Sequence, residues 1–188
     1  MQATFPSFFT RDLCRGPFKF TLTDLHPSNI FVDDDWHITS LVDLEWACTR
    51  PIEMLRTPTW LTNKACDEIA QETIDYDTVR SEFIGIMTEK ESLLGSRGQI
   101  PESLSETMER GWGRGTFWFS LALASPTGLF SVFYRQIQPR FIKYCEDHDF
   151  FHDTMPWYWA HDYVSVGAAK QQDRIDYDAR LKTVFGVE

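Results

Sequence analysis

The chain has 188 residues, which is long enough for one domain with a substantial core and too short for two large ones. Hydrophobic residues make up 43% and aromatic residues 15% of the sequence, so the composition argues against a disordered chain. The 28 acidic residues outnumber the 18 basic ones and give a net charge of −10, which repels nucleic-acid backbones and anionic membrane surfaces. We therefore expect neither nucleic acid nor a membrane among the partners.

The cysteines and the N-terminal sequence favour a cytoplasmic protein. The four cysteines are scattered and form no Cys-x-x-Cys pair: they are Cys14, Cys48, Cys66 and Cys145. Free thiols of this kind are typical of a reducing compartment. The first residues lack the basic stretch followed by an apolar run that marks a signal peptide.

Residues 18–43 have the pattern of short strands. Residues 18–23 alternate apolar and polar side chains, residues 30–32 form an apolar triplet, and residues 37–43 are rich in β-branched side chains. The acidic string 33–35 lacks the glycine and glutamate that an EF-hand calcium loop requires, so we interpret it as a hairpin turn. The segment predicts a small β-hairpin region.

The sequence after Pro51 changes to helical spacing. Apolar residues recur every three or four positions over 76–94, and further helices are predicted over 103–110, 127–144 and 157–185. A mostly helical body therefore follows the strands, which defines an α+β fold.

The uncharged run at 115–134 is nominally long enough to span a bilayer. The string Ser125–Gly128 interrupts it with turn chemistry, so we predict two buried helices that meet at this turn. The glycine-rich string 111–115 is predicted to be a flexible joint between helices.

Asp24, Asn29 and Asp43 stand at the ends of the predicted strands, and two adjacent hairpins would bring them to a common point. One carboxylate can orient a hydroxyl group and accept its proton. A second carboxylate and an amide oxygen suit magnesium, and such a set serves phosphoryl transfer. In the structural alternative, Asp24 and Asn29 stabilise a solvated turn, and Asp43 caps a helix that starts at Leu44.

Three further residues near these positions are secondary candidates. His26 is interpreted as bracing the loop, with contact to substrate or phosphate as the alternative. Glu45 and Glu53 are retained as residues that could reach the site.

The string TDLHPSNIFVDDDWHITSLVDLEWA at 23–47, followed by RPIE, resembles the aminoglycoside-phosphotransferase-like family of kinase-like proteins, in its fungal-type branch. The spacing of Asp24 and Asn29 is similar to that of the protein-kinase catalytic loop, and Asp43 stands where the metal-binding aspartate follows. The resemblance implies Asp24 as the catalytic base. It implies Asn29 and Asp43 as ligands of Mg²⁺ and as part of the site for ATP, the co-substrate. Its motifs cover about 18–62.

The resemblance also implies a domain plan, namely a kinase-like C-terminal lobe forming one domain over 1–188. The catalytic and metal-binding segment would be 18–53 and the helical body 54–188. Leu22 and Thr23 replace the family's usual histidine and glycine. No N-lobe with a nucleotide-covering loop and a strand lysine is recognisable ahead of the loop. We therefore expect weak or absent activity from the isolated chain.

The implied partners are ATP and a hydroxyl group of an unidentified small molecule. A second hypothesis is a non-catalytic, pseudokinase-like module. Such a module would bind a partner, or a second copy of itself, through the face that an N-lobe would cover.

Overall fold

The computed structural model describes residues 4–13, 15–94, 103–125, 131–141, 150, 153 and 162–186. The chain divides into two compact units, Met1–Lys143 and Tyr144–Glu188, and each is described by itself. The expectation of one domain over the whole chain stays a prediction.

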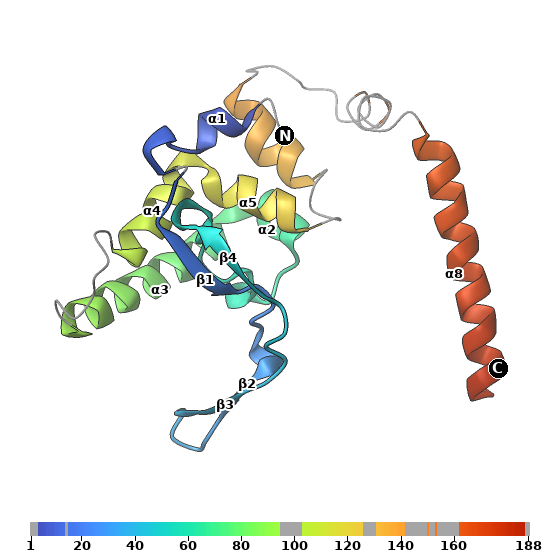
Figure 1. Cartoon of the computed structure of the whole chain (residues 1–188), viewed down its shortest axis with the longest axis horizontal. Coiled ribbons are helices and arrows are strands. Elements are labelled where there is room, and N and C mark those ends of the chain that lie inside the picture. Colours follow the sequence, from blue (N-terminus) through green and yellow to red (C-terminus); the bar gives the residue numbers. More distant parts are fainter. Residues whose placement is uncertain are drawn as a thin grey trace. The chain divides into compact units, whose positions relative to one another are not determined.

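The protein is a mixed α+β structure, as the sequence predicts (Figure 1). The described strands are β1 (Phe18–Leu22), β2 (Ile30–Val32), β3 (Ile38–Leu41) and β4 (Ala47–Pro51). The longer helical elements are α1 (Phe5–Phe8), α2 (Cys66–Gln71), α3 (Thr73–Leu94), α4 (Leu104–Arg114), α5 (Thr116–Ala124) and, in the second unit, α8 (Tyr163–Phe185). Short 3₁₀ turns occupy Arg11–Leu13, Pro27–Asn29, Ile52–Met54, Thr59–Thr62 and Gln138–Arg140, and a π-helical segment occupies Phe133–Ile137.

The four strands form two antiparallel pairs, one inside the other in sequence. β1 pairs with β4, with Phe18 opposite Pro51 and Leu22 opposite Ala47. β2 pairs with β3 to form a hairpin whose two ends connect to β1 and β4. The hairpin projects from the body of the first unit (Figure 1).

The predicted arrangement of two adjacent hairpins is wrong, because β1 pairs with β4 and the hairpin lies between them in sequence. β4 is missing from the sequence-based prediction. Its residues, ACTRP, lack a clear alternation of apolar side chains and end in proline. The strand exists because of a partner far away in sequence, which no local pattern reveals.

The acidic turn of the hairpin agrees with the prediction. Asp33 Oδ1 accepts hydrogen bonds from the backbone N–H groups of Asp35 (3.0 Å) and His37 (2.8 Å). Trp36 completes the reversal with a left-handed backbone, φ 64°. The carboxylate of Asp33 thus satisfies backbone donors of the turn, as an aspartate in this position commonly does.

The core of the first unit lies around α5, whose residues Thr116–Ala122 are all buried. A buried helix at this place confirms one of the two predicted for the uncharged run; Pro126–Gly128, in the predicted turn, lie outside the described residues. Among the residues that the structure describes, no helix is both long and apolar enough to cross a membrane.

The predicted joint at 111–115 is reduced to a single residue. Gly111 and Gly113 lie inside α4, and Gly115 alone, with φ 90°, ends α4 and precedes α5. A Cβ atom at Gly115 would lie 2.6 Å from Arg140 Cζ. Glycine is therefore required here both by its backbone conformation and by the close approach of a side chain.

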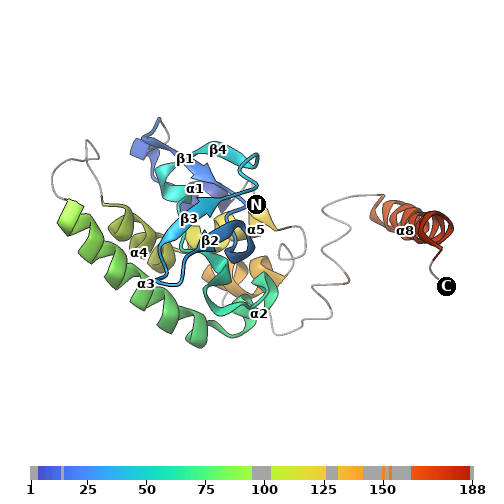
Figure 2. The ribbon, with the colours of Figure 1, turned by 90° about the horizontal axis from the view of Figure 1, so that it is seen from below.

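α3 and α4 lie side by side (Figure 2). Arg80 of α3 is almost fully buried and pairs with Glu109 of α4 and with Asp77. Its guanidinium also lies 4.8 Å from the ring centroid of Trp112. The long helix predicted over 76–94 is confirmed, and it begins three residues earlier.

The second unit contains α8, which agrees with the predicted C-terminal helix from Tyr163 onward. Residues 157–161 of that prediction lie outside the described residues. Arg174 and Asp178 are one turn apart and 3.9 Å from each other. An exposed pair of this kind contributes little to stability.

The hydroxyl group of Tyr76 offers a test of the helical core. The side chain is fully buried, and its hydroxyl lies 2.8 Å from Thr57 Oγ1 and 3.1 Å from the Pro58 carbonyl. Burial raises the pKa of Tyr76 to about 12, because the phenolate would lose its hydration. The folded state therefore retains a proton that the unfolded chain releases near pH 10.

We predict that Tyr76→Phe lowers the free energy of unfolding by about 1 kcal/mol near neutral pH, since a buried hydrogen bond is lost. The wild type is expected to lose about 2 kcal/mol relative to this variant as the pH rises from about 10 to about 12. Urea unfolding of both proteins across this range measures the difference. A difference in stability that does not change with pH would contradict the burial of the hydroxyl.

Candidate active site

The candidate site is built on the segment between β1 and β4. The ladder of these two strands continues one step past Leu22, because Thr23 donates to the Trp46 carbonyl from both its backbone N–H (2.8 Å) and its Oγ1 (2.7 Å). These two hydrogen bonds close the segment at its base. Asp24 follows immediately, so the position of this aspartate is set by the end of the ladder.

The loop after Asp24 is a compact 3₁₀ turn. The backbone N–H of Ser28 donates to His26 Nδ1 at 3.3 Å, and the Asn29 N–H donates to the His26 carbonyl at 2.9 Å. His26 thus braces the loop, as predicted. On the side of the helices, the indole N–H of Trp60 donates to the Leu25 carbonyl at 2.7 Å. The loop is therefore stabilised both by hydrogen bonds within it and by a hydrogen bond from Trp60.

Asn29 connects two of the predicted site positions. Its side-chain Nδ2 donates to the Asp24 carbonyl at 3.1 Å. Its own carbonyl accepts the Val42 N–H at 3.1 Å, one residue before Asp43. The amide nitrogen is therefore engaged, and Oδ1, which accepts from Ser28 Oγ at 3.3 Å, has a second lone pair for another partner.

Asp43 ends the β2–β3 hairpin in an unusual conformation. Its φ of 59° lies in the left-handed region, which is costly for a residue with a Cβ atom. Residues 44–46 are not helical and β4 begins at Ala47, so the alternative in which Asp43 caps a helix from Leu44 is wrong. Strained residues of this kind concentrate at functional sites.

The side chains of the predicted site differ in exposure. Asp24 and Asp43 are exposed and Asn29 is half-buried. Asn29 is thus held in place by its surroundings, whereas the two carboxylates face solvent and remain hydrated. Carboxylate oxygens that face solvent are accessible to a substrate hydroxyl or to a metal ion.

Glu53 is not available to this site. Both of its carboxylate oxygens accept hydrogen bonds from Thr10, at 3.0 and 3.1 Å from the backbone N–H and 2.6 Å from Oγ1. Glu53 is buried, and its contacts attach the N-terminal segment to the turn after β4. Glu45 is exposed and stays a candidate by sequence proximity alone.

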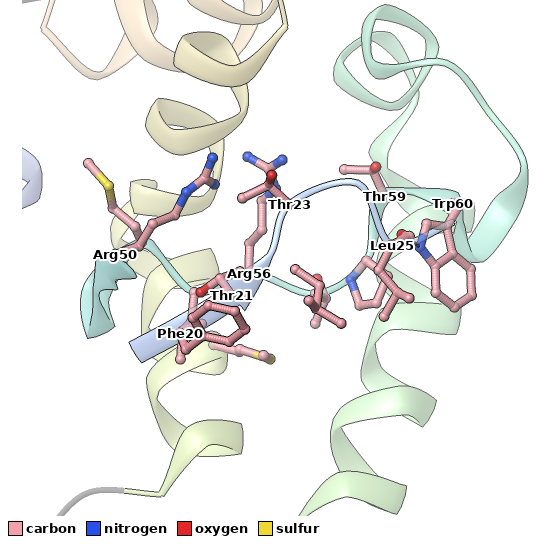
Figure 3. A pocket seen from close by; sticks show the side chains of 14 residues that line it. Phe20, Thr21, Thr23, Leu25, Arg50, Arg56, Thr59 and Trp60 are labelled. Carbon is pink, nitrogen blue, oxygen red and sulfur yellow. Dashed lines mark hydrogen bonds between the residues drawn. The ribbon is translucent and has the colours of Figure 1, made fainter. Parts of the chain in front are cut away.

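A cavity of about 320 Å³ lies next to the loop (Figure 3). It is lined by residues of β1, by Arg50 of β4, by residues 54–60 and by Met108 of α4. Thr23 and Leu25, the two neighbours of Asp24 in sequence, both contribute to its wall. The cavity therefore adjoins the segment that carries Asp24.

The sequence-based prediction missed the two arginines of this cavity. Arg50 and Arg56 extend in the same direction in Figure 3. Burial lowers the pKa of the Arg56 guanidinium, and the positive charge of Arg50 lowers it further. No local pattern marks these arginines, because the cavity that they line is formed by β1, β4, residues 54–60 and Met108, which are distant from one another in sequence.

The donor set of the predicted site consists of two carboxylates and one amide oxygen. Oxygen ligands of this type fit magnesium, which usually keeps several water molecules and takes one or two carboxylates from a protein. Within the described residues, no group of three or more His, Cys, Asp or Glu side chains is arranged to hold a metal ion. The roles of Asp24, Asn29 and Asp43 stay predictions.

Comparison of this chain with protein-family models, with curated proteins and with solved structures found no match.

The backbone of Asp43 gives a direct test of the site's geometry. Asp43→Gly and Asp43→Ala both remove the carboxylate, but only glycine adopts a left-handed backbone without strain. We predict that the Gly variant is more stable than the Ala variant by about 1 kcal/mol. At Asp35, whose φ is not in this region, the same pair of substitutions should favour alanine or show no difference. Denaturant unfolding measures both comparisons, and equal stability of the two Asp43 variants would contradict the strained conformation.

Proposed function

We propose that the protein carries a kinase-like phosphotransferase site, which transfers the terminal phosphoryl group of ATP to a hydroxyl group of a small molecule. The observation that supports this most is the double role of Asn29, which bonds to Asp24 with its side chain and to the residue before Asp43 with its backbone. A base and two metal ligands are thereby connected through one residue. Phosphoryl transfer depends on such positioning more than on covalent chemistry.

In this proposal Asp24 is the catalytic base. Its exposed carboxylate accepts a hydrogen bond from the acceptor hydroxyl, aims the oxygen at the terminal phosphorus and takes the proton as the new phosphorus–oxygen bond forms. The bond between that phosphorus and the bridging oxygen breaks, and ADP leaves with the electron pair. The Thr23–Trp46 hydrogen bonds hold the backbone of Asp24 during this step.

Asn29 Oδ1 and the Asp43 carboxylate are the residues that would hold Mg²⁺. Because Asn29 Nδ2 is bound to the Asp24 carbonyl, the orientation of the amide is fixed, and Oδ1 keeps one lone pair for a metal ion beside the hydrogen bond that it accepts from Ser28 Oγ. Bound there, Mg²⁺ neutralises charge on the phosphate oxygens of ATP. The left-handed backbone of Asp43 fixes the direction in which its side chain leaves the hairpin.

The alternative function is a non-catalytic binding module, and one observation favours it. The strand region exposes several large apolar side chains. Their exposed fractions include 73% for Phe20, 84% for Trp36 and 63% for Trp46. An apolar surface of this kind is typical of a face that another polypeptide covers. An N-lobe or a second copy of the chain would each fit it.

Calorimetry with a non-hydrolysable ATP analogue tests the proposal. We predict Mg²⁺-dependent binding to the wild type and a loss of affinity of about tenfold or more in Asp43→Ala, because a direct metal ligand is removed. Asp34→Ala is the matched control, since it removes one carboxylate from the exposed hairpin turn and should bind as the wild type does. Any ATP turnover should vanish in Asp24→Ala.

Equal affinity of the wild type and Asp43→Ala, or binding that does not require Mg²⁺, would contradict the phosphotransferase site. An absence of nucleotide binding together with a stable oligomer in sedimentation velocity would favour the binding module instead.

A further inference from the structure

The cavity beside the β1–β4 ladder carries positive charge that no residue of the described structure neutralises. Arg50 and Arg56 both line it, and neither forms an ion pair or a side-chain hydrogen bond with any described residue. Nη1 of Arg56 is buried and has no hydrogen-bond partner in the part of the chain that the structure describes. A buried donor without a partner costs free energy, and structures rarely retain one without a reason.

The nearest acidic residue in sequence does not supply the missing charge. Glu53 lies between the two arginines in the chain, but its carboxylate is bound to Thr10 at 2.6 to 3.1 Å. Since both of its oxygens are engaged there, the two guanidinium groups have no carboxylate partner among the described residues. This occurs in a chain whose net charge is −10, where acidic partners are abundant.

The strand pairing adds a third positive charge. Lys19 of β1 is directly opposite Arg50 of β4. Like charges at directly opposed positions of an antiparallel pair destabilise it. Lys19 also forms no ion pair within the described residues. Two independent features thus involve the arginines that line the cavity: the unpaired guanidinium nitrogen of Arg56, and the like-charged cross-strand pair that Arg50 forms with Lys19.

The size and lining of the cavity fit a small molecule. Its volume of about 320 Å³ lies at the lower end of the range for ligand pockets. Thr21, Thr23 and Thr59 contribute polar side chains, while Leu25 and Trp60 contribute apolar surface. A ligand with a negatively charged group next to the arginines and a short carbon skeleton next to Leu25 and Trp60 would match both the charged and the apolar part of the cavity.

We propose that this cavity binds an anionic small molecule, with its carboxylate or phosphate group held between the guanidinium groups of Arg50 and Arg56. Guanidinium groups form paired hydrogen bonds with the two oxygens of such anions. The bound anion would also supply a partner for the buried Arg56 nitrogen and reduce the repulsion between Arg50 and Lys19.

The proposed anion site is argued from Arg50 and Arg56 alone and does not require phosphoryl transfer. A deeper consequence rests on the proposed function: because Thr23 and Leu25 flank Asp24 and line the cavity, the acceptor would be an alcohol that carries an anionic group. Anion binding is measured without ATP or Mg²⁺, so a failure of the phosphotransferase proposal leaves this measurement unaffected.

The test is calorimetric titration of the full chain with inorganic phosphate, with acetate and with glycerol as a neutral probe. We expect phosphate or acetate to bind, and glycerol not to bind at the same concentrations. The anion that binds with the higher affinity shows whether the cavity prefers a phosphate or a carboxylate group. Arg50→Gln and Arg56→Gln should each weaken that binding about tenfold or more. Arg15→Gln, which removes the same charge from an exposed position outside the cavity, should bind as the wild type does.

Thermal unfolding without any added anion gives an independent measure. Arg56→Gln should melt at the same temperature as the wild type or higher, since it removes an uncompensated charge, whereas an arginine with a purely structural role would lower the melting temperature when replaced. A clearly lower melting temperature, undetectable binding of both anions to the wild type, or equal weakening by Arg15→Gln would each overturn the proposal.

Discussion

The pairing of β1 with β4 is the constraint on which the candidate site depends. The two strands join residues that are about thirty positions apart, and the double hydrogen bond from Thr23 to the Trp46 carbonyl ends the ladder. The β2–β3 hairpin is anchored at both ends by this pairing, so its free end can be exposed while its base stays fixed. Asp24 directly follows Thr23 at the end of the ladder, and Asp43 directly follows Val42, whose N–H donates to the Asn29 carbonyl. The β1–β4 ladder closes the segment between Leu22 and Ala47 into one loop. This closure limits the positions that Asp24 and Asp43, which both lie in that segment, can occupy.

The sequence predicts the elements whose signals are local. The alternation in residues 18–23 and the acidic turn after Val32 identify β1 and the hairpin, and the spacing in 76–94 identifies α3. β4 and its partner could not be predicted, because the alternation is weak in ACTRP and the pairing is long-range. The order of strands was therefore wrong although three of the four strands were found.

In the candidate site, too, some features are visible in the sequence and others depend on the three-dimensional structure. Asp24, Asn29 and Asp43 stand out in the sequence because of their spacing and chemistry. The hydrogen bond from Asn29 to the Asp24 carbonyl depends on the loop's conformation and appears only in the structure. Arg50 and Arg56 were not predicted, because the cavity that they line depends on the long-range pairing of β1 with β4 and on the turn that follows it. Net charge is misleading: a chain that is acidic as a whole has a basic cavity.

We propose that the side chains of Asp24, Asn29 and Asp43 share one divalent ion. Manganese, which accepts the same oxygen ligands as magnesium, broadens the NMR signals of nuclei near it. If the three side chains share an ion, a small amount of Mn²⁺ will broaden the signals of Asp24, Asp43 and the Asn29 side-chain amide together, before those of other residues. Broadening confined to the acidic turn at Asp33, or an unaffected Asn29 side chain, would contradict it.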